Sequence, residues 1–388
     1  MTSVELFAGA GGLALGTSLA GFSHKAVVEI DHDACNTIRA NQARKLPHVV
    51  DWPLFEADVT KFPFDMCGTN IDLLAAGVPC QPWSMGGKHK GMQDTRNMFP
   101  EMLTAVRTMR PKAILIENVK GLLRQSFANY FQYIRLMLSF PEVLRKDKEH
   151  WPHHLARLEE YETSGAKDGL CYNVVHELLN AANYGVPQKR ERVFIVCFRN
   201  DLGVKWHFPT QTHSDALLWE SQFVTGEYWD EHKVAKKNRP EKASPRETAR
   251  FRERNLFDEK RERWQTVRDA ITPLGPPGSG KFENHTQQSG ARSYPGHTGS
   301  PLDEPAKTLK AGDHGVPGGE NTILYPDGTI RYMTVRESAR LQTFPNDYIF
   351  TGSWSENMRQ LGNAVPAELG QVVAAGIREK LREKRIAD

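Results

Sequence analysis

The stretch SVELFAGAGG, residues 3–12, decides the fold. Its first five residues are typical of a strand, and its glycines form a turn into a helix predicted over residues 13–20. Glycine lets the backbone approach a ligand closely, and a helix N-terminus offers free N–H groups. The turn lacks the Gly-x-Gly-x-x-Gly register of dinucleotide-binding proteins, which favours an adenosine-bearing ligand without a pyrophosphate.

A second strand is predicted over residues 26–28, and it ends at Glu29. In βαβ units of this kind, an acid at that place usually holds ribose hydroxyls. The spacing therefore supports a nucleoside site at the glycine turn.

A cysteine follows the apolar run 71–76, in the segment GVPCQPWS at residues 77–84. Prolines on both sides of Cys80-Gln81 fix φ and remove backbone donors, so a stiff turn presents the thiol. A thiolate presented in this way suits nucleophilic attack on an electrophilic carbon. The alternative is a small buried hydrophobic residue, the usual role of a free cysteine.

A carboxylate ends the apolar strand predicted over residues 114–119, ILIENV. In open α/β sheets ligands bind outside the carboxyl ends of the strands, so Glu117 and Cys80 are expected to face one pocket. A partly buried glutamate there would be protonated near neutral pH and act as an acid. A helix cap or an ion-paired structural glutamate is the alternative.

Two arginines, Arg190 and Arg192, stand two apart in GVPQKRER, before an apolar strand predicted at residues 193–198. On an extended segment such residues point the same way, and their guanidinium groups suit phosphate oxygens or a base carbonyl. A solvated basic turn is the alternative.

Together these segments resemble the DNA cytosine-5 methyltransferases, in an ordered set of motifs that covers most of the chain. The resemblance includes TVRESARLQ at residues 334–342 and QLGNAVP at residues 360–366. It implies a doubly wound, Rossmann-like α/β sheet with a smaller inserted target-recognition domain. The expected divisions are a catalytic domain at 1–206, a target-recognition domain at 207–330 and a segment at 331–388 that returns to the catalytic domain. Within that segment we expect a helix over 365–383 and a structural role for Arg336 at the junction.

The resemblance also implies catalytic roles. Cys80 would attack carbon 6 of a cytosine flipped out of duplex DNA, and Glu117 would hold or protonate its ring nitrogen 3. Arg192 would bind the cytosine O2, while Arg190 would support the same pocket or a nearby phosphate. Asn118 would position the loops around Glu117.

The methyl donor implied is S-adenosylmethionine, with S-adenosylhomocysteine as product and no metal. Glu29 would take the ribose hydroxyls, Ile30 would cover the adenine, and Asp58 would read its amino group. Ile30 stands where some family members have an aromatic residue, which leaves the strength of adenine stacking open. The residues assigned to the cofactor are Phe7, Gly9, Gly11, Glu29, Ile30, Asp58, Val59, Met98, Asn363 and Ala364.

Contacts with double-stranded DNA are expected from two regions. The glycine-rich, basic loop 84–97 would close over the minor groove and push the base out, and the segment 207–330 would read the target sequence. Residues 230–263 carry twelve Lys or Arg against eight Asp or Glu, a net of 12 − 8 = +4, typical of a DNA-facing arm or of a solvated helix with ion pairs. The residues assigned to DNA are Ser84, Lys88, Lys90, Arg292 and Thr308.

Composition agrees with this interpretation. The chain has 388 residues, 25% of them charged, and a formal net charge of +3, so any basic DNA-binding surface must be local. Neither a membrane helix nor a signal peptide is evident, and five scattered cysteines without a Cys-x-x-Cys pair indicate a reducing compartment without structural zinc. We therefore expect a bacterial, cytoplasmic protein that acts on nucleoid DNA.

Two motifs are set aside. Residues 275–281 fit Gly-x-x-x-x-Gly-Lys, but Phe282 replaces the Ser or Thr of a P-loop. His150, His153 and His154 are expected to be surface histidines within an insertion at 141–167. The apolar pattern of that insertion predicts an amphipathic helix that packs on the core or on a partner.

Three rival functions are considered. The long variable segment disfavours a tRNA methyltransferase. The intact Cys80, Glu117 and Arg192 disfavour a non-catalytic homologue. The glycine register disfavours an oxidoreductase. The target sequence, the oligomeric state and an accompanying restriction endonuclease are left open.

Overall fold

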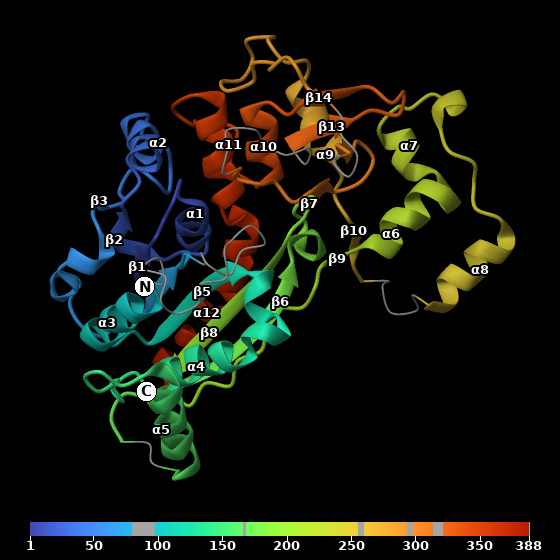
Figure 1. Cartoon of the computed structure of the whole chain (residues 1–388). Helices are drawn as coiled ribbons and strands as arrows, with labels where there is room; N and C mark the ends of the chain where they lie inside the picture. The colour runs from blue at the N-terminus through green and yellow to red at the C-terminus, as the bar shows by residue number, and fades with distance from the viewer. Residues whose placement is uncertain (80–97, 166–167, 255–259, 293–297, 313–320, 388) are drawn as a thin grey trace.

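The computed structural model describes residues 1–79, 98–165, 168–254, 260–292, 298–312 and 321–387 (Figure 1). Cys80, Ser84, Lys88 and Lys90 lie outside these described residues, as does most of the loop expected to close over DNA.

A mixed sheet of seven strands forms the centre of the fold, in the order β3-β2-β1-β4-β5-β8-β6. The first five strands in this order run parallel, whereas β8 is antiparallel to both of its neighbours. The apolar runs identified in the sequence are buried strands here, because both faces of the sheet are covered. The strands are β1 Thr2–Leu6, β2 Ser23–Glu29, β3 Leu54–Glu56, β4 Leu73–Ala76, β5 Ala113–Val119, β6 Tyr172–Asn180 and β8 Glu191–Arg199.

Helices cover the two faces, and the alternation of side chains along β5 divides the core between them. Ile114 and Ile116 pack in a cluster with residues of α3 (Phe99–Met109) and α4 (Ala128–Ser139). Leu115 faces the opposite cluster, which contains residues of α1 (Gly12–Leu19) and α12 (Ala367–Ala387). Figure 1 shows α12 behind the sheet and α4 in front of it.

In the C-terminal segment, α12 packs on α1. A Cβ atom at Gly16 would lie 2.6 Å from the carbonyl of Ala367, so the two helices are in backbone contact. Before α12 come α10 (Val335–Leu341) and α11 (Trp354–Asn363), and α2 (His32–Ala43) follows β2. Arg336 is fully buried and donates to the carbonyls of Glu283, Pro345 and Tyr348.

Residues 207–330 contain mostly short elements. One of them, β12 (Ala306–Lys307), pairs with β7 (Gln188–Lys189). A glycine- and proline-rich loop contains residues 275–281, which follow a 3-10 turn at Thr272–Leu274 and not a strand, so no P-loop is formed. The elements are β9 His213–Ser214, α6 Asp215–Glu220, α7 Glu227–Glu231, α8 Pro245–Arg254, β10 Glu262–Arg263, α9 Val267–Ile271, β11 Ser300–Pro301, β12 Ala306–Lys307, β13 Thr322–Leu324 and β14 Ile330–Tyr332.

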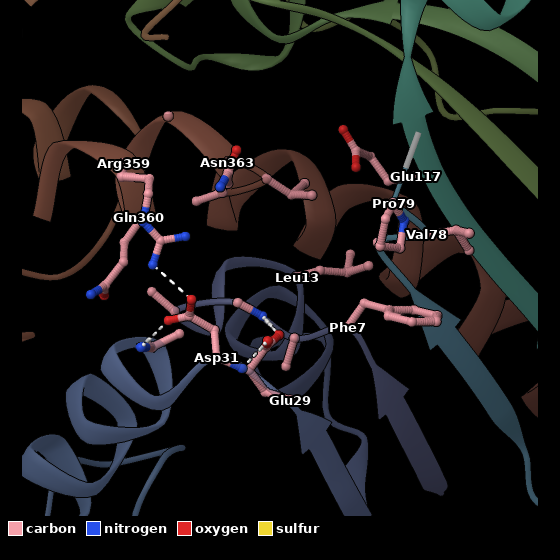
Figure 2. Close-up of a pocket in the computed structure, with 18 of the residues that line it drawn as sticks. Phe7, Leu13, Glu29, Asp31, Val78, Pro79, Glu117, Arg359, Gln360 and Asn363 are labelled. Atoms are coloured by element: carbon pink, nitrogen blue, oxygen red, sulfur yellow. Dashed lines mark hydrogen bonds and ion pairs between the residues drawn. The ribbon is translucent and has the colours of Figure 1, made fainter. Parts of the chain in front are cut away.

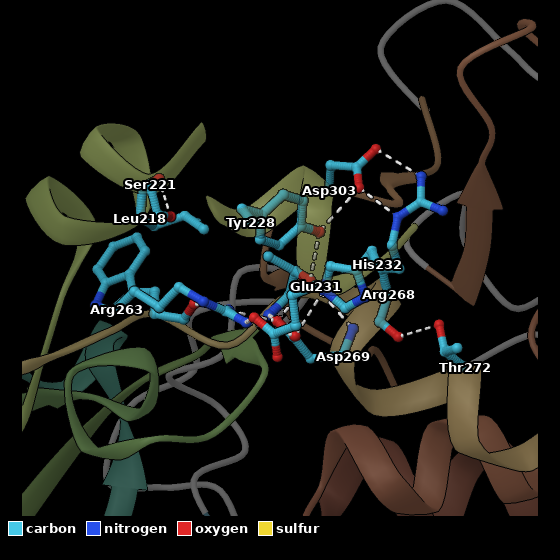
Figure 3. A network of polar contacts seen from close by, with 12 residues as sticks. Leu218, Ser221, Tyr228, Glu231, His232, Arg263, Arg268, Asp269, Thr272 and Asp303 are labelled. Carbon is cyan, nitrogen blue, oxygen red and sulfur yellow. Dashed lines mark hydrogen bonds and ion pairs between the residues drawn. The ribbon is translucent and has the colours of Figure 1, made fainter. Parts of the chain in front are cut away.

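A network of charged groups joins these short elements (Figure 3). Arg263 lies 2.8 Å from the Asp269 carboxylate, which also accepts from the backbone amide of Thr266 in a capping box at the start of α9. Arg268 contacts Asp303 at 2.6 Å, and the Tyr228 hydroxyl donates to the same carboxylate at 2.8 Å. These charge-assisted hydrogen bonds connect α7, β10, α9 and the turn after β11.

The insertion expected at 141–167 contains α5 (Trp151–Thr163), which packs against α4. Leu158 is fully buried in the core cluster, so the helix packs on the core of its own chain. The prediction of three surface histidines is wrong for His154. Its ring is buried between the Tyr133 hydroxyl and the Val143 carbonyl, each 2.8 Å away, whereas His150 and His153 are exposed. Throughout the described part of the chain, no helix has the length and apolar character needed to cross a bilayer.

Candidate active site

A cavity of about 350 Å³ opens at the carboxyl ends of β1, β2, β4 and β5, and α11 and the chain after it form its opposite wall (Figure 2). Its position is the one that an open α/β sheet offers to a ligand. The cavity is lined by residues 7–10, 13, 29–31, 34, 77–79, 117–119, 192, 359, 360 and 362–365.

The glycine turn is held by Glu29, whose side chain points back toward it (Figure 2). One carboxylate oxygen accepts from the Gly9 amide at 2.6 Å, and the other accepts from the amides of Ile30 and Asp31 at 2.9 and 2.8 Å. Burial raises the pKa of Glu29, and the three amide donors oppose that shift. Phe7, at φ 56°, adopts a left-handed conformation that is rare for a bulky residue. Such backbone conformations are often found at ligand sites.

Gly11 is needed for the turn but does not line the cavity. Its φ is 85°, and an added Cβ would lie 2.8 Å from the Trp52 ring. A larger residue would therefore be strained in backbone and in packing. Gly11 is placed here as a structural residue, next to the expected ligand site.

Ile30 lines the cavity while 64% of its surface is exposed. An apolar side chain left open to solvent at a cavity is available to cover the face of an apolar ligand. Asn363 and Ala364 line the opposite wall, so the structure brings Phe7, Gly9 and Ile30 together with the end of α11.

Asp58, Val59 and Met98 do not line the cavity. The Asp58 carboxylate accepts from the Thr60 amide at 2.9 Å and caps a 3-10 turn at Val59–Lys61. Val59 is buried in the core, and Met98 precedes α3 and packs against the same core. All three therefore have structural contacts in this conformation.

Asp31 and Arg359 are cavity residues that the sequence analysis missed. Arg359 of α11 lies 2.8 Å from the Asp31 carboxylate, which also caps α2 by accepting from the Ala34 amide (Figure 2). The pair connects the two walls across 328 residues of sequence. The available signals were weak: an acid at the start of a predicted helix, and an arginine directly before the QLGNAVP motif.

Glu117 and Arg192 form an ion pair at the other end of the cavity, with 2.8 Å between Oε1 and Nε. Their side chains are only 10% and 13% exposed, respectively. Burial raises the pKa of Glu117, and the positive charges of Arg192 and Arg190 oppose the shift. Burial also lowers the pKa of Arg192, so each group carries a desolvation cost that its partner offsets in part.

Arg190 is completely buried behind this pair. Its guanidinium donates to the carbonyls of Leu309, at 3.1 Å, and Gly362, at 2.7 Å. A group with no exposed surface cannot meet a phosphate, so that alternative for Arg190 is wrong in this conformation. The side chain instead joins the chain between β7 and β8 to the segment after β12 and to the end of α11.

Asn118 connects the cysteine segment to β5. Its side-chain amide donates to the Val78 carbonyl at 3.2 Å, and its side-chain oxygen accepts from the Val119 amide at 2.8 Å. Val78 and Pro79 line the cavity beside Glu117 (Figure 2). The chain therefore enters the segment that contains Cys80 from the edge of the cavity.

The two described residues assigned to DNA lie outside the cavity. The Thr308 hydroxyl donates to the Lys189 carbonyl at 2.8 Å, next to the pairing of β12 with β7. Arg292 is exposed in the loop between α9 and β11.

Comparison with known proteins gives a family match across most of the chain. A family model described as C-5 cytosine-specific DNA methylase matches residues 1–140 and 155–379. The type II methyltransferase M.Eco47II of Escherichia coli is 31% identical over 391 residues, which are 97% of this chain and 78% of that protein. The type II methyltransferase M.NgoMIV of Neisseria gonorrhoeae is 29% identical over 393 residues, 99% of each. The crystal structure of the S. pombe Dnmt2 methyltransferase shares the fold, with a TM-score of 0.56 and 16% identity over 99% of both chains.

Proposed function

The chain belongs to the C-5 cytosine-specific DNA methylases, and from this premise we propose that it methylates one cytosine, flipped out of a specific duplex DNA sequence, through a covalent adduct of Cys80. As a member it is a DNA (cytosine-5-)-methyltransferase. The observation that carries the mechanistic proposal is the buried ion pair of Glu117 and Arg192, in one cavity with Val78 and Pro79, which precede Cys80.

The ion pair supports recognition of the cytosine ring. Arg192 presents guanidinium N–H donors, which suit the carbonyl at position 2 of the base. A protonated Glu117 donates to ring nitrogen 3, and its raised pKa favours that form. The two groups are held side by side on β5 and β8, so they match two neighbouring atoms of one ring edge.

These contacts would draw electrons toward nitrogen 3 and O2 of the cytosine, which makes carbon 6 open to attack by Cys80. The Cys80 thiolate forms a bond to carbon 6, and the electrons of the 5,6 double bond move toward carbon 5 as nitrogen 3 takes the proton of Glu117. Carbon 5 then takes the methyl group, whose bond to the donor sulfur would break to leave S-adenosylhomocysteine. Loss of the carbon 5 proton to solvent restores the 5,6 double bond and expels Cys80 as a thiolate, and nitrogen 3 returns its proton to Glu117.

Members of this family use S-adenosylmethionine, which supplies the methyl as an electrophile. The residues at the cavity fit that molecule. A glycine turn allows close approach, Glu29 can accept from ribose hydroxyls, and the exposed Ile30 can cover the adenine. Asp31 adds a second carboxylate near the same wall. The remainder of the S-adenosylmethionine molecule would be enclosed by Phe7, Gly9, Asn363 and Ala364.

Recognition of the target sequence is assigned to the separate division at 207–330, with 1–206 and 331–388 forming the catalytic part. Support comes from the short elements of this segment, which are fixed by ion pairs and carry long loops. Arg292 and Thr308 are proposed to contact DNA there. The type II names of the bacterial relatives support a cognate restriction endonuclease that acts on the same sequence.

The test is incubation with labelled S-adenosylmethionine and either duplex DNA or tRNA, followed by bisulfite sequencing of the DNA. Label in DNA, with methylated cytosines in one repeated sequence context, is expected. Label confined to tRNA, or absent from both, would overturn the proposal.

A further inference from the structure

A second cavity, of about 320 Å³, lies between α3, α4 and the start of the 141–167 insertion, and we name it the α3–α4 cavity. It shares no residue with the candidate active site. Leu103 and Arg107 of α3 line one side, and Tyr133 and Met137 of α4 line the other. Figure 1 shows α4 in front of the sheet and α5 below it, away from the elements of residues 207–330.

The walls of the α3–α4 cavity depend on a segment that lies outside the family match. The family match stops at residue 140 and resumes at 155. Five lining residues come from the unmatched interval 141–154: Pro141, Val143, Leu144, Arg145 and His154. His154 is held in place by bonds to Tyr133 and Val143 through both ring nitrogens.

The lining is apolar and cationic, and no acidic residue is among its described members. Aromatic and aliphatic side chains form most of it, and Leu144 is 56% exposed at the surface. A mainly apolar concave site with a few polar groups is typical of a small-molecule site. Its cationic groups select for a negative charge on the ligand.

The two arginines of the lining differ from their neighbours. Arg110 and Arg157 do not line the cavity, and each has a carboxylate partner. Arg110 lies 2.6 Å from the Glu142 carboxylate, and Arg157 lies 2.7 Å from the Glu149 carboxylate. Arg107 has no carboxylate within ion-pair distance among the described residues, and it donates to the Pro141 carbonyl and to Thr104 instead. Arg145 likewise has no ion-pair partner in the described part of the chain. Arg107 is half-buried, and a guanidinium of this kind outside any described ion pair is a suitable partner for an incoming anion.

We propose that the α3–α4 cavity binds a small molecule with an apolar, aromatic-sized body and one carboxylate. The body fills the space between Leu103, Tyr133 and Met137. The carboxylate meets Arg107, and Arg145 adds its charge at the opening. This ligand site is distinct from the cofactor and DNA sites and belongs to the insertion of this chain.

The test is calorimetric titration of the full-length protein with 2-naphthoate and with its neutral counterpart, 2-naphthalenemethanol. The proposal predicts saturable one-to-one binding of naphthoate and at least about tenfold weaker binding of the alcohol, since a charge-assisted contact is lost. Arg107→Gln should reduce naphthoate affinity by a similar factor and leave the affinity for the alcohol unchanged. Arg110→Gln is the matched control, because it removes a nearby guanidinium that is outside the lining.

Three results would each overturn the proposal. The first is no binding of naphthoate to the wild type at millimolar concentration. The second is equal affinity for acid and alcohol. The third is an equal loss of naphthoate affinity in Arg107→Gln and Arg110→Gln, which would indicate only long-range charge. Circular dichroism of each variant distinguishes a lost contact from a lost fold, and Arg145→Gln provides an exposed second variant expected to weaken naphthoate binding.

Discussion

Arg192 Nε lies 2.8 Å from Glu117 Oε1, and both side chains are nearly buried at the edge of the cavity. The two residues come from antiparallel neighbours, β5 and β8, where Val119 pairs with Arg192 and Glu117 pairs with Phe194. The sheet register therefore fixes an acid and a cation side by side, and it does so next to the segment that leads to Cys80.

Removing the ionisable proton of Glu117 should abolish most activity. We expect Glu117→Gln to lower kcat by about 10²- to 10⁴-fold, the usual contribution of a positioned general acid. Because burial raises the pKa of Glu117, its protonated form persists to higher pH, and the wild-type rate should fall as pH rises through that pKa. The residual activity of the variant should lack this alkaline decline.

Glu177→Gln is the control for Glu117→Gln. Glu177 is exposed on β6 and is paired with Phe194 of β8, the residue that Glu117 of β5 also pairs with. It is therefore a glutamate at the same level of the sheet but outside the cavity. Single-turnover methyl transfer from pH 6 to 9 makes the comparison. Equal rates in Glu117→Gln and the wild type would contradict the role of Glu117.

Replacing Arg190 should lower stability. Arg190→Met leaves the Leu309 and Gly362 carbonyls without their donor inside the protein. Each buried unsatisfied group costs about 1–3 kcal/mol, so the free energy of unfolding should fall by about 2–6 kcal/mol. Urea unfolding measures this effect, with the exposed Arg292→Met as control. A stability equal to that of the control would show that the buried guanidinium does not hold these segments.

The buried carboxyl of Glu5 should make stability depend on pH. Glu5 is fully buried in β1, and neither of its oxygens has a hydrogen-bond partner among the described residues. Burial raises its pKa well above the usual value, so the folded state retains a proton that the unfolded state loses. The stability from this group is complete below the unfolded pKa and is lost as pH rises toward the folded pKa, by about 1.4 kcal/mol per pH unit.

Urea unfolding of the wild type and of Glu5→Gln at pH 5, 6, 7 and 8 measures the Glu5 effect. Other titrating groups cancel in the difference between the two proteins. The variant should gain stability relative to the wild type as pH rises. A difference that does not change with pH would contradict a raised pKa of Glu5.

Ile30 should contribute to cofactor affinity through apolar contact. Ile30→Ala removes much of the side chain exposed at the cavity, and we expect about fivefold weaker binding of S-adenosylhomocysteine, from roughly 1 kcal/mol of lost apolar burial. Ile30→Phe should bind more tightly, because an aromatic ring offers a larger face. Calorimetry measures both, with Met66→Ala as control because Met66 is 56% exposed and outside the cavity. Unchanged affinity in both Ile30 variants would place the adenine elsewhere.

The central strands and the glycine turn were predictable from sequence, because buried strands are near-continuous apolar runs and turns need glycine. The run at 114–116 became the middle of β5, and Glu29 ended β2 as expected. The antiparallel direction of β8 could not be read from its residues, since an apolar strand looks the same in either direction.

The remaining differences depend on tertiary contacts. Asp58 and Val59 have a spacing that suits a ligand site, but local capping and core packing decide their contacts here. Asp31 and Arg359 meet across 328 residues, and His154 is buried only because Tyr133 and the Val143 carbonyl satisfy its ring. None of these partners is visible in a local pattern.

The most direct test of the covalent mechanism compares Cys80→Ala with the wild type in transfer of labelled methyl groups to duplex DNA, with DNA binding measured on the same samples. Our account predicts that methyl transfer is lost and DNA binding is retained, because the thiolate is required to activate the ring and not to hold the duplex. Methyl transfer that survives in Cys80→Ala would contradict the covalent mechanism.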